Sequence, residues 1–227
     1  MNNNILCIVA HPDDEILGFG ATTAKLTKQG YKVTNCILSG EVNARRHKPE
    51  NKELMEDLLA AQKIVGAEKP IVGHFPNIEF NTIPHLELVQ FIEQTIECIE
   101  PDFIFTHYPY DLNNDHYQVS IACQAASRLF QRKKIKPLKG LFFIEILSST
   151  DWAFPVDSNI FSPDTFVEVG AELIDIKIKA LSTYRGVMRE YPHPRSPEVL
   201  KGIAAYRGSQ AGIKYAEAFK TAFQVLF

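Results

Sequence analysis

ILCIVAHPDDE, at residues 5–15, is an apolar run that leads directly into a charged cluster. The run at residues 5–10 is continuous rather than alternating, which is typical of a strand covered on both faces in a parallel sheet. Residues 15–29 have the pattern of a helix, and Gly30 follows as a C-terminal cap. A strand followed by a helix begins a βαβ unit, so the segment predicts a parallel α/β sheet.

The alternation of strand and helix continues over the first 150 residues. The patterns predict strands at residues 5–10, 32–39, 70–73, 102–106, 141–146 and 166–169, and helices at residues 15–29, 51–65, 84–99, 116–132, 171–184 and 213–225. Residues 191–212 are rich in Pro, Arg, Gly and Ser and predict loops, so we expect a loop-rich cap over about residues 185–227. The expected fold is an α/β, Rossmann-like three-layer sandwich with a mostly parallel sheet, built by residues 1–227 as one domain. Ligands of such folds bind at the C-terminal ends of the strands, where we expect the active site.

Composition argues against several classes of protein. The 227 residues are 45% hydrophobic and 22% charged, with a net charge of −3, as in an ordinary globular protein. The short basic stretches at residues 45–48 and 132–136 are interpreted as solvated surface, so no nucleic-acid partner is expected. We expect no membrane span and no signal peptide. The four scattered cysteines form no C-x-x-C pair and are interpreted as free thiols, which favours a cytoplasmic protein.

The charged cluster, HPDDE at residues 11–15, follows the first predicted strand. Like charges this close repel one another, and a bound divalent cation would neutralise them. We expect His11 and Asp14 to bind one ion, while Asp13 faces the attacking water. The alternative is that Asp13 or Asp14 only caps the helix that follows.

A second polar cluster, THYPYDLNNDH at residues 106–116, follows another predicted strand. His116 would supply the third protein ligand of a catalytic zinc, which keeps one position open. Such an ion lowers the pKa of a bound water to roughly 7 and polarises a carbonyl, and a nearby carboxylate transfers the proton. Asp115 is interpreted as a partner of a ligand histidine. Two histidines and one aspartate do not fix the metal, so Fe²⁺ or Co²⁺ stay open beside Zn²⁺.

AHPDDE, at residues 10–15, resembles the signature of the PIG-L/LmbE-like zinc-dependent N-deacetylase family. The resemblance extends over nearly the whole chain, through residues 39–41, 75–77, 111–116, 195–198 and 206–208. It implies that the zinc ligands are His11, Asp14 and His116. It also implies that Asp13 is the general base and later the proton donor. Sugar-contacting groups would come from the loop after the second strand, at Glu41, Arg45 and Arg46.

One departure from the family concerns the oxyanion. Many members carry a histidine three residues before the last zinc ligand, where this chain has Asn113. Asn113 can donate a hydrogen bond to developing negative charge, which is worth ~3 kcal/mol, but it cannot supply a proton. His107, after a strand, and His193, between two prolines, are the other candidates. The alternatives are a structural role for His107 and an exposed turn for His193.

Aromatic residues give weaker signals. Trp152 could stack on a sugar ring, and Tyr108 flanks the second cluster and could hydrogen-bond substrate, although packing roles are the alternative for both. Phe219, Phe223 and Phe227 recur every four residues and are interpreted as one face of a terminal helix, in the core or at a homo-oligomer contact.

These residues predict a zinc-dependent hydrolase that removes an N-acetyl group from an amino sugar or a sugar-containing metabolite. The expected partner is a small-molecule N-acetylated sugar. Two alternatives use the same ligands: an amidase for another N-acyl or thiol-conjugate substrate, and a metal-binding relative with reduced catalysis. A dinucleotide site is disfavoured, because Gly18 and Gly20 fall within the predicted helix and acidic residues at its start would repel a pyrophosphate.

Overall fold

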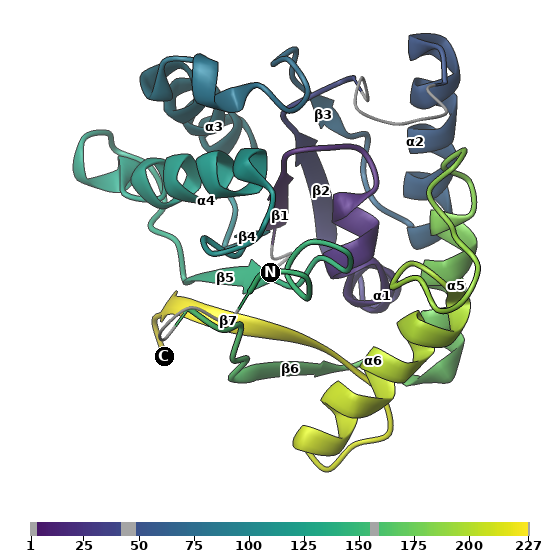
Figure 1. Ribbon diagram of the computed structural model, residues 1–227. Helices are drawn as coiled ribbons and strands as arrows, with labels where there is room; N and C mark the ends of the chain where they lie inside the picture. The colour runs from purple at the N-terminus through teal and green to yellow at the C-terminus, as the bar shows by residue number, and fades with distance from the viewer. Residues whose placement is uncertain (1–3, 42–48, 155–158, 227) are drawn as a thin grey trace.

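A mixed, mostly parallel sheet forms the middle layer of the protein (Figure 1). The computed structural model describes residues 4–41, 49–154 and 159–226. Its strands are β1 (Asn4–Val9), β2 (Lys32–Ile37), β3 (Ile71–Val72), β4 (Phe103–His107), β5 (Gly140–Ile144), β6 (Thr165–Glu168) and β7 (Ala216–Gln224). The strand order is β3-β2-β1-β4-β5-β7-β6, in which β1 to β5 pair in parallel and β7 runs antiparallel to both β5 and β6. The prediction of a mostly parallel α/β sheet is confirmed.

The continuous apolar run of β1 is explained by its place inside the sheet. Ile5, Cys7 and Val9 face one hydrophobic core, and Leu6 and Ile8 face the other. All five side chains are buried. A strand that is covered on both faces needs apolar residues at every position rather than at alternate ones.

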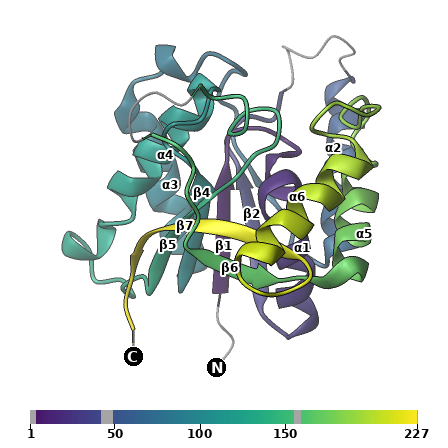
Figure 2. The ribbon, with the colours of Figure 1, turned by 60° about the horizontal axis from the view of Figure 1, so that its bottom comes forward.

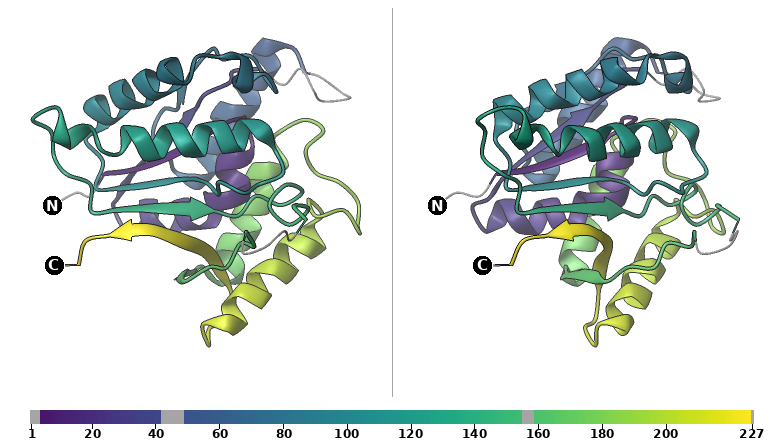
Figure 3. Two further views of the ribbon diagram at one scale, coloured as in Figure 1. Left: turned by 60° about the vertical axis from the view of Figure 1, so that its left-hand side comes forward. Right: turned by 90° about the vertical axis from the view of Figure 1, so that its left-hand side faces the viewer.

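Helices cover both faces of the sheet (Figures 2 and 3). One side carries α1 (Asp14–Lys28), α2 (Asn51–Val65), α5 (Gly170–Leu181) and α6 (Pro197–Gln210), and the other carries α3 (His85–Ile99) and α4 (Asn114–Ala126). A short 3₁₀ helix, η1 (Phe80–Thr82), precedes α3, and another, η2 (Leu129–Gln131), follows α4. The prediction of a three-layer sandwich is confirmed.

The helix predicted at residues 213–225 is wrong, because this segment forms strand β7. β7 pairs Phe223 with Leu141 and Thr221 with Phe142, so a bulge adds one residue to β7 between these pairs. The bulge turns Phe219 and Phe223 toward opposite cores of this same chain. A spacing of four residues therefore fits a bulged strand as well as a helix.

The segment expected to be a loop-rich cap contains helix α6. Ser196 accepts a hydrogen bond from the backbone N–H of Val199 (3.3 Å), and Pro197 stands in the first turn. Ser followed by Pro is a common start of a helix, and this signal outweighs the glycines and polar residues nearby.

The expectation of free cysteines agrees with the structure. Cys7, Cys36 and Cys123 are buried free thiols, and Cys98 is exposed and free. Across the described ranges, no helix is both long and apolar enough to cross a membrane.

Candidate active site

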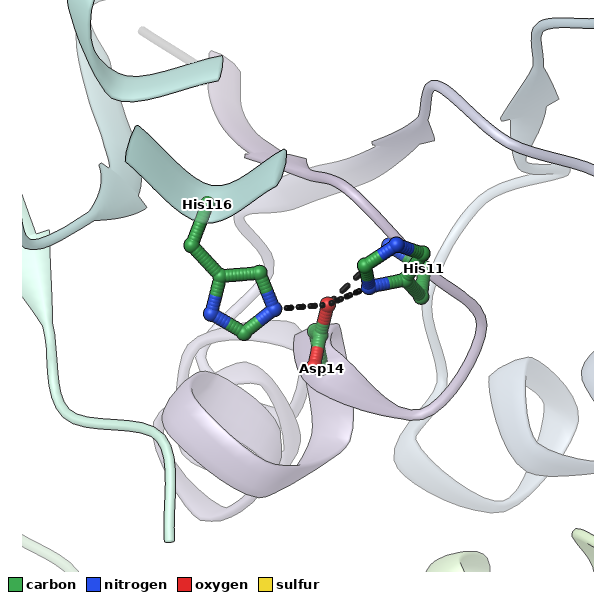
Figure 4. A group of neighbouring side chains, drawn as sticks. All are labelled: His11, Asp14 and His116. Atoms are coloured by element: carbon green, nitrogen blue, oxygen red, sulfur yellow. Dashed lines mark hydrogen bonds and ion pairs between the residues drawn. The ribbon is translucent and has the colours of Figure 1, made fainter. Parts of the chain in front are cut away.

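The two polar clusters meet at the carboxyl edge of the sheet. β1 and β4 are neighbouring parallel strands, so the segments that follow them leave the sheet at the same edge. His11 and Asp14 come from the turn into α1, and His116 comes from the first turn of α4 (Figure 4). Their ligand atoms all lie within 4.8 Å of one another, and the ring centroids of His11 and His116 are 5.4 Å apart. The two histidines are therefore close enough to share one ion.

Asp14 stands at the centre of this group. Its Oδ2 atom lies 3.4 Å from Nδ1 of His11 and 3.2 Å from Nε2 of His116. Two ligand atoms that bind the same zinc ion at about 2.0–2.2 Å lie roughly 3–3.5 Å from each other when the geometry is tetrahedral. The observed separations match this spacing, and all three residues are buried.

His116 has the unsatisfied nitrogens expected of a metal ligand. Neither of its ring nitrogens makes a hydrogen bond of acceptable geometry within the described residues, although both lie near carboxylates. A buried polar atom without a partner is costly. A divalent ion bound to Nε2 would remove this cost at that nitrogen, so the residues present fit a metal ion.

A carboxylate supports His11 from the side that faces away from the candidate ion site. Nε2 of His11 lies 2.9 Å from Oδ2 of Asp115. Asp115 also accepts hydrogen bonds from the backbone N–H groups of Ile78 (2.6 Å) and Phe80 (3.0 Å). Carboxylates in this position fix the ring orientation of metal-binding histidines, which is the role that the sequence suggests for Asp115.

Asp111 lies beside His116 as an ion-pair partner, a role not predicted from the sequence. Its Oδ2 atom lies 3.1 Å from Nδ1 of His116. Asp111 also accepts hydrogen bonds from the hydroxyl groups of Ser149 and Thr150, which follow β5. The only sequence signal for this role was the density of polar residues between residues 106 and 116.

The carboxylates keep His116 protonated when no metal is bound. Burial alone would lower its pKa, but Asp14 and Asp111 outweigh burial and raise the pKa to about 10. Burial also opposes ionisation of Asp14, yet His116 and His11 hold the pKa of Asp14 well below its usual value. For His11, burial again lowers the pKa, but the hydrogen bonds to Asp115 and Asp14 outweigh burial. The pKa of His11 is therefore raised above its usual value. A metal ion must therefore displace a proton from this group.

His107 lies behind His116. The two rings stack with centroids 3.8 Å apart, and Nε2 of His107 accepts a hydrogen bond from the backbone N–H of Ala10 (2.8 Å). Burial, followed by the nearby charge of His116, lowers the pKa of His107 well below its usual value. His107, Asp111 and His116 form a second compact group of possible ligands. Because Asp111 already accepts hydrogen bonds from two hydroxyl groups, we assign the ion to the first group.

An open pocket of about 170 Å³ lies beside the candidate ligands. Its described lining consists of His11, Asp13, Asp14, Asn77, Ile78, Asn113, His116, Ser148, Ser149 and Arg195. Asp13, Ile78 and Ser148 have positive φ angles of 104°, 66° and 68°. Backbone strain of this kind concentrates at functional sites.

Asp13 lies at the pocket wall, and its backbone is held from the core side. Its N–H donates to Oε2 of Glu15 (3.0 Å). The other oxygen of Glu15 accepts hydrogen bonds from Tyr184 (2.5 Å) and Gln62 (3.0 Å). Burial raises the pKa of Glu15 to about 8. The last residue of the HPDDE motif thus fixes the turn that carries Asp13.

Asn113 lines the same pocket as the N-cap residue of α4. Its Oδ1 atom accepts a hydrogen bond from the backbone N–H of Asp115 (2.9 Å). Because the oxygen caps the helix, Nδ2 is the end of the side chain available to donate into the pocket.

The structure brings His11, Asp13, Asp14, Asn113 and His116 together at the pocket, with His107 stacked against His116, and the other predicted residues lie elsewhere. His193 accepts a hydrogen bond on Nδ1 from the backbone N–H of Arg195, and its ring contacts Trp152 with centroids 5.5 Å apart. Trp152 is half exposed. Neither side chain is among the described residues that line the pocket.

The remaining predicted substrate contacts also lie outside the described lining of the pocket. Tyr108 is buried in a neighbouring cavity, where its hydroxyl group donates to the carbonyl oxygen of Ile160 (3.2 Å). Glu41 follows β2 and donates its backbone N–H to Ser39. Arg45 and Arg46 lie outside the described residues.

These observations define an α/β protein with a buried group of two histidines and one aspartate at the carboxyl edge of a parallel sheet. The family model for PIG-L, GlcNAc-PI de-N-acetylase, matches residues 6–127. The chain belongs to this family.

Two relatives match over most of their length. Diacetylchitobiose deacetylase of Thermococcus kodakarensis is 25% identical over 233 residues, which cover 95% of this chain and 82% of the relative. A probable N-acetyl-alpha-D-glucosaminyl L-malate deacetylase 2 of Bacillus subtilis is 27% identical over 207 residues, which cover 84% of this chain and 87% of the relative.

Solved structures share the whole fold. The conserved protein TT1542 from Thermus thermophilus has a TM-score of 0.80 at 24% identity, covering 100% of this chain and 97% of the other. GalB, the 4-carboxy-2-hydroxymuconate hydratase of Pseudomonas putida, has a TM-score of 0.77 at 21% identity, covering 99% and 98%. Because a hydratase shares this fold, the fold alone does not define the reaction.

Proposed function

We propose that this chain is a zinc-dependent hydrolase that removes the N-acetyl group from an amino sugar or a sugar-containing metabolite. The observation that carries the proposal is the convergence of His11, Asp14 and His116 beside Asp13, which lines the same pocket. Family membership supports it, as do two relatives that are named deacetylases of acetylated sugars.

Each residue of the site has a role in this reaction. His11, Asp14 and His116 would hold the metal ion, which when bound supplies Lewis-acid activation of water and of the amide carbonyl. Asp13 accepts a proton from the attacking water and passes it to the amine nitrogen as the C–N bond breaks. The Nδ2 group of Asn113 donates a hydrogen bond to the carbonyl oxygen as negative charge develops there. The products are acetate and a free amine.

Several finer predictions belong to the same proposal. Zn²⁺ is the expected ion, although Fe²⁺ and Co²⁺ suit the same ligands. Free, buried thiols suit a reducing compartment, so we assign the protein to the cytoplasm. The alternative substrates are another N-acyl group or a thiol conjugate, which the ligand set does not distinguish.

Acetate release tests the proposal. Zinc-loaded protein is incubated with N-acetylglucosamine and diacetylchitobiose, and Asp13→Asn is compared with the parent. We expect the variant to keep its zinc and to lose activity by about 10²- to 10⁴-fold, as for loss of a general base.

Asp175→Asn serves as the matched control, because Asp175 pairs with Lys201 at the surface. An Asp13→Asn variant as active as the parent would refute the mechanism. Release of a different acyl group, without acetate, would favour the alternative amidase.

A further inference from the structure

Arg195 reaches the proposed general base from a distant part of the chain. Its Nη1 group donates a hydrogen bond to Oδ2 of Asp13 at 3.1 Å, across a separation of 182 residues. Its Nε group donates to the hydroxyl oxygen of Ser148 at 2.9 Å. Arg195 lines the candidate active-site pocket with both partners, and only about a fifth of its side chain is exposed.

We propose that Arg195 is a positioning residue for the reaction: braced by Ser148, it fixes the orientation of the Asp13 carboxylate against the pocket. The inference rests on the proposed function, in which Asp13 is the general base. A general base must lie within hydrogen-bond reach of the proton that it removes, so the orientation of its carboxylate matters.

Asp13 is thus held at two points. Glu15 binds its backbone N–H from the core side, where the residue has a φ of 104°. Arg195 binds a carboxylate oxygen from the pocket side. A hydrogen bond between two charged groups is stronger than a neutral one, and the planar guanidinium group can fix two oxygens at once. Here these oxygens belong to Asp13 and Ser148.

The turn that follows β5 connects both halves of the site. Ser148, with a φ of 68°, anchors Arg195. The next two residues, Ser149 and Thr150, anchor Asp111, which supports His116. The position of the base relative to a metal ligand therefore depends on three consecutive side chains in one turn.

Arg195 is itself held in place by its own segment. Its backbone N–H donates to Nδ1 of His193 (3.0 Å), and the following residue, Ser196, caps α6. Of the pocket-lining residues that the structure describes, Arg195 is the one with a permanent positive charge. It offsets the negative charge of Asp13 and Asp14 on the same wall.

The test measures kcat and KM for acetate release by zinc-loaded Arg195→Gln, Arg195→Lys and Ser148→Ala. We expect Arg195→Gln to lower kcat by about 10- to 100-fold, as misplaced catalytic groups do, with KM and zinc content close to those of the parent. Arg195→Lys should recover only part of this loss, because an ammonium group cannot bridge Asp13 and Ser148 in the same way. Ser148→Ala keeps the arginine and should show a smaller loss of kcat.

Arg189→Gln is the matched control. Arg189 lies in the same segment but donates to the carbonyl oxygens of Gly186 and Met188, outside the pocket. We expect parental kcat and KM for this variant.

Several results would overturn the inference. An unchanged kcat in Arg195→Gln would do so, and a change confined to KM would show that Arg195 binds substrate instead. Loss of zinc along with activity would assign Arg195 to the metal site.

Trp152, the single tryptophan of the chain, contacts His193, so its fluorescence reports whether the segment around Arg195 has moved. If Arg195→Gln shifts this emission, the segment has moved and the kcat of Arg195→Gln is no longer informative. The kcat of Ser148→Ala then tests the inference, and an unchanged value in that variant overturns it.

A crystal structure of Arg195→Gln separates this inference from the proposed function. The Asp13 carboxylate should leave its parental position or occupy more than one orientation. A carboxylate that stays in place overturns the inference, whatever the activity. A parent protein that releases no acetate from either sugar contradicts the proposed function only.

Discussion

His116 lies between two carboxylates, and this position determines how the proposed metal binding would depend on pH. Asp14 and Asp111 raise the pKa of His116 to about 10 against the effect of burial. Below that pH the metal-free ring carries a proton, and a histidine must lose this proton to bind a metal ion. Protons and metal ions therefore compete for His116 throughout the neutral range.

We expect zinc affinity to rise with pH between about 6 and 9, with release of about one proton per ion bound. Calorimetry of zinc binding in buffers of different ionisation enthalpy measures the protons released. Asp111→Asn removes one of the two carboxylates that raise the pKa, so the variant should release fewer protons at pH 8. It should also bind zinc about 10- to 100-fold more weakly, as when the supporting partner of a ligand histidine is lost. An affinity that does not change with pH would contradict this account.

The sequence identified residues of the site that lie in local motifs but not those that depend on tertiary contacts. The candidate ligands and Asp13 follow strand ends in two short motifs, so strand order alone brings them together. Asp111 acts through hydroxyl groups 38 and 39 residues away, and Arg195 through a carboxylate 182 residues away. No periodicity or spacing encodes such pairs, so their roles appear only in the folded chain.

Helix α1 packs closely on strand β5 because it carries a glycine at the contact. A Cβ atom at Gly18 would lie 2.8 Å from the Cδ1 atoms of Ile144 and Ile146. Gly202, in α6, has no neighbour within 4 Å of the same position. The two helical glycines therefore differ in whether there is room for a side chain.

Gly18→Ala and Gly202→Ala should change stability in opposite directions. Alanine gains up to ~1 kcal/mol over glycine inside a helix, whereas overpacking costs about 1–3 kcal/mol. We expect Gly202→Ala to raise the free energy of unfolding by about 0.5–1 kcal/mol and Gly18→Ala to lower it by ~1 kcal/mol. Denaturant unfolding measures both, and stabilisation by Gly18→Ala would show that the side chains of Ile144 and Ile146 can move to make room.

Prediction of elements succeeded where periodicity and local end signals agree. The helix predicted at residues 51–65 has the same bounds in the structure, where Glu50 and Glu53 form a capping box and Gly66 ends the helix. Prediction failed near the C-terminus for two reasons. Phenylalanines four residues apart suggested one face of a helix, whereas a bulged strand buries them in two different cores. Composition concealed the Ser196–Pro197 start of α6.

In the molecule as a whole, the candidate metal ligands and the other residues that line the pocket come partly from different halves of the chain. The family model covers residues 6–127, which include the candidate ligands and Asp13. The remainder supplies Ser148, Arg195 and strand β7, which lies between β5 and β6. Strand β7 therefore joins β6 to β5, and the turn that follows β5 forms part of the pocket wall.

Phe219 and Phe223 allow a test of the bulged-strand conformation of β7. Phe219 is fully buried, with ring centroids 5.0 Å from Phe105 and 5.8 Å from Phe19. Phe223 packs on the opposite core and is only partly buried. We expect Phe219→Ala to lower the free energy of unfolding by about 3–5 kcal/mol, as for large-to-small changes in a core. Phe223→Ala should cost less than about 2 kcal/mol, because less apolar area is lost.

Urea unfolding of both variants measures the difference. In an amphipathic helix, residues four apart share one face, so both rings would be buried to a similar extent and both changes would cost about the same. Similar losses would therefore contradict a bulged strand at residues 216–224. A much larger loss at Phe219 is the result expected when one residue inserted by a bulge turns the two rings to opposite sides of the sheet.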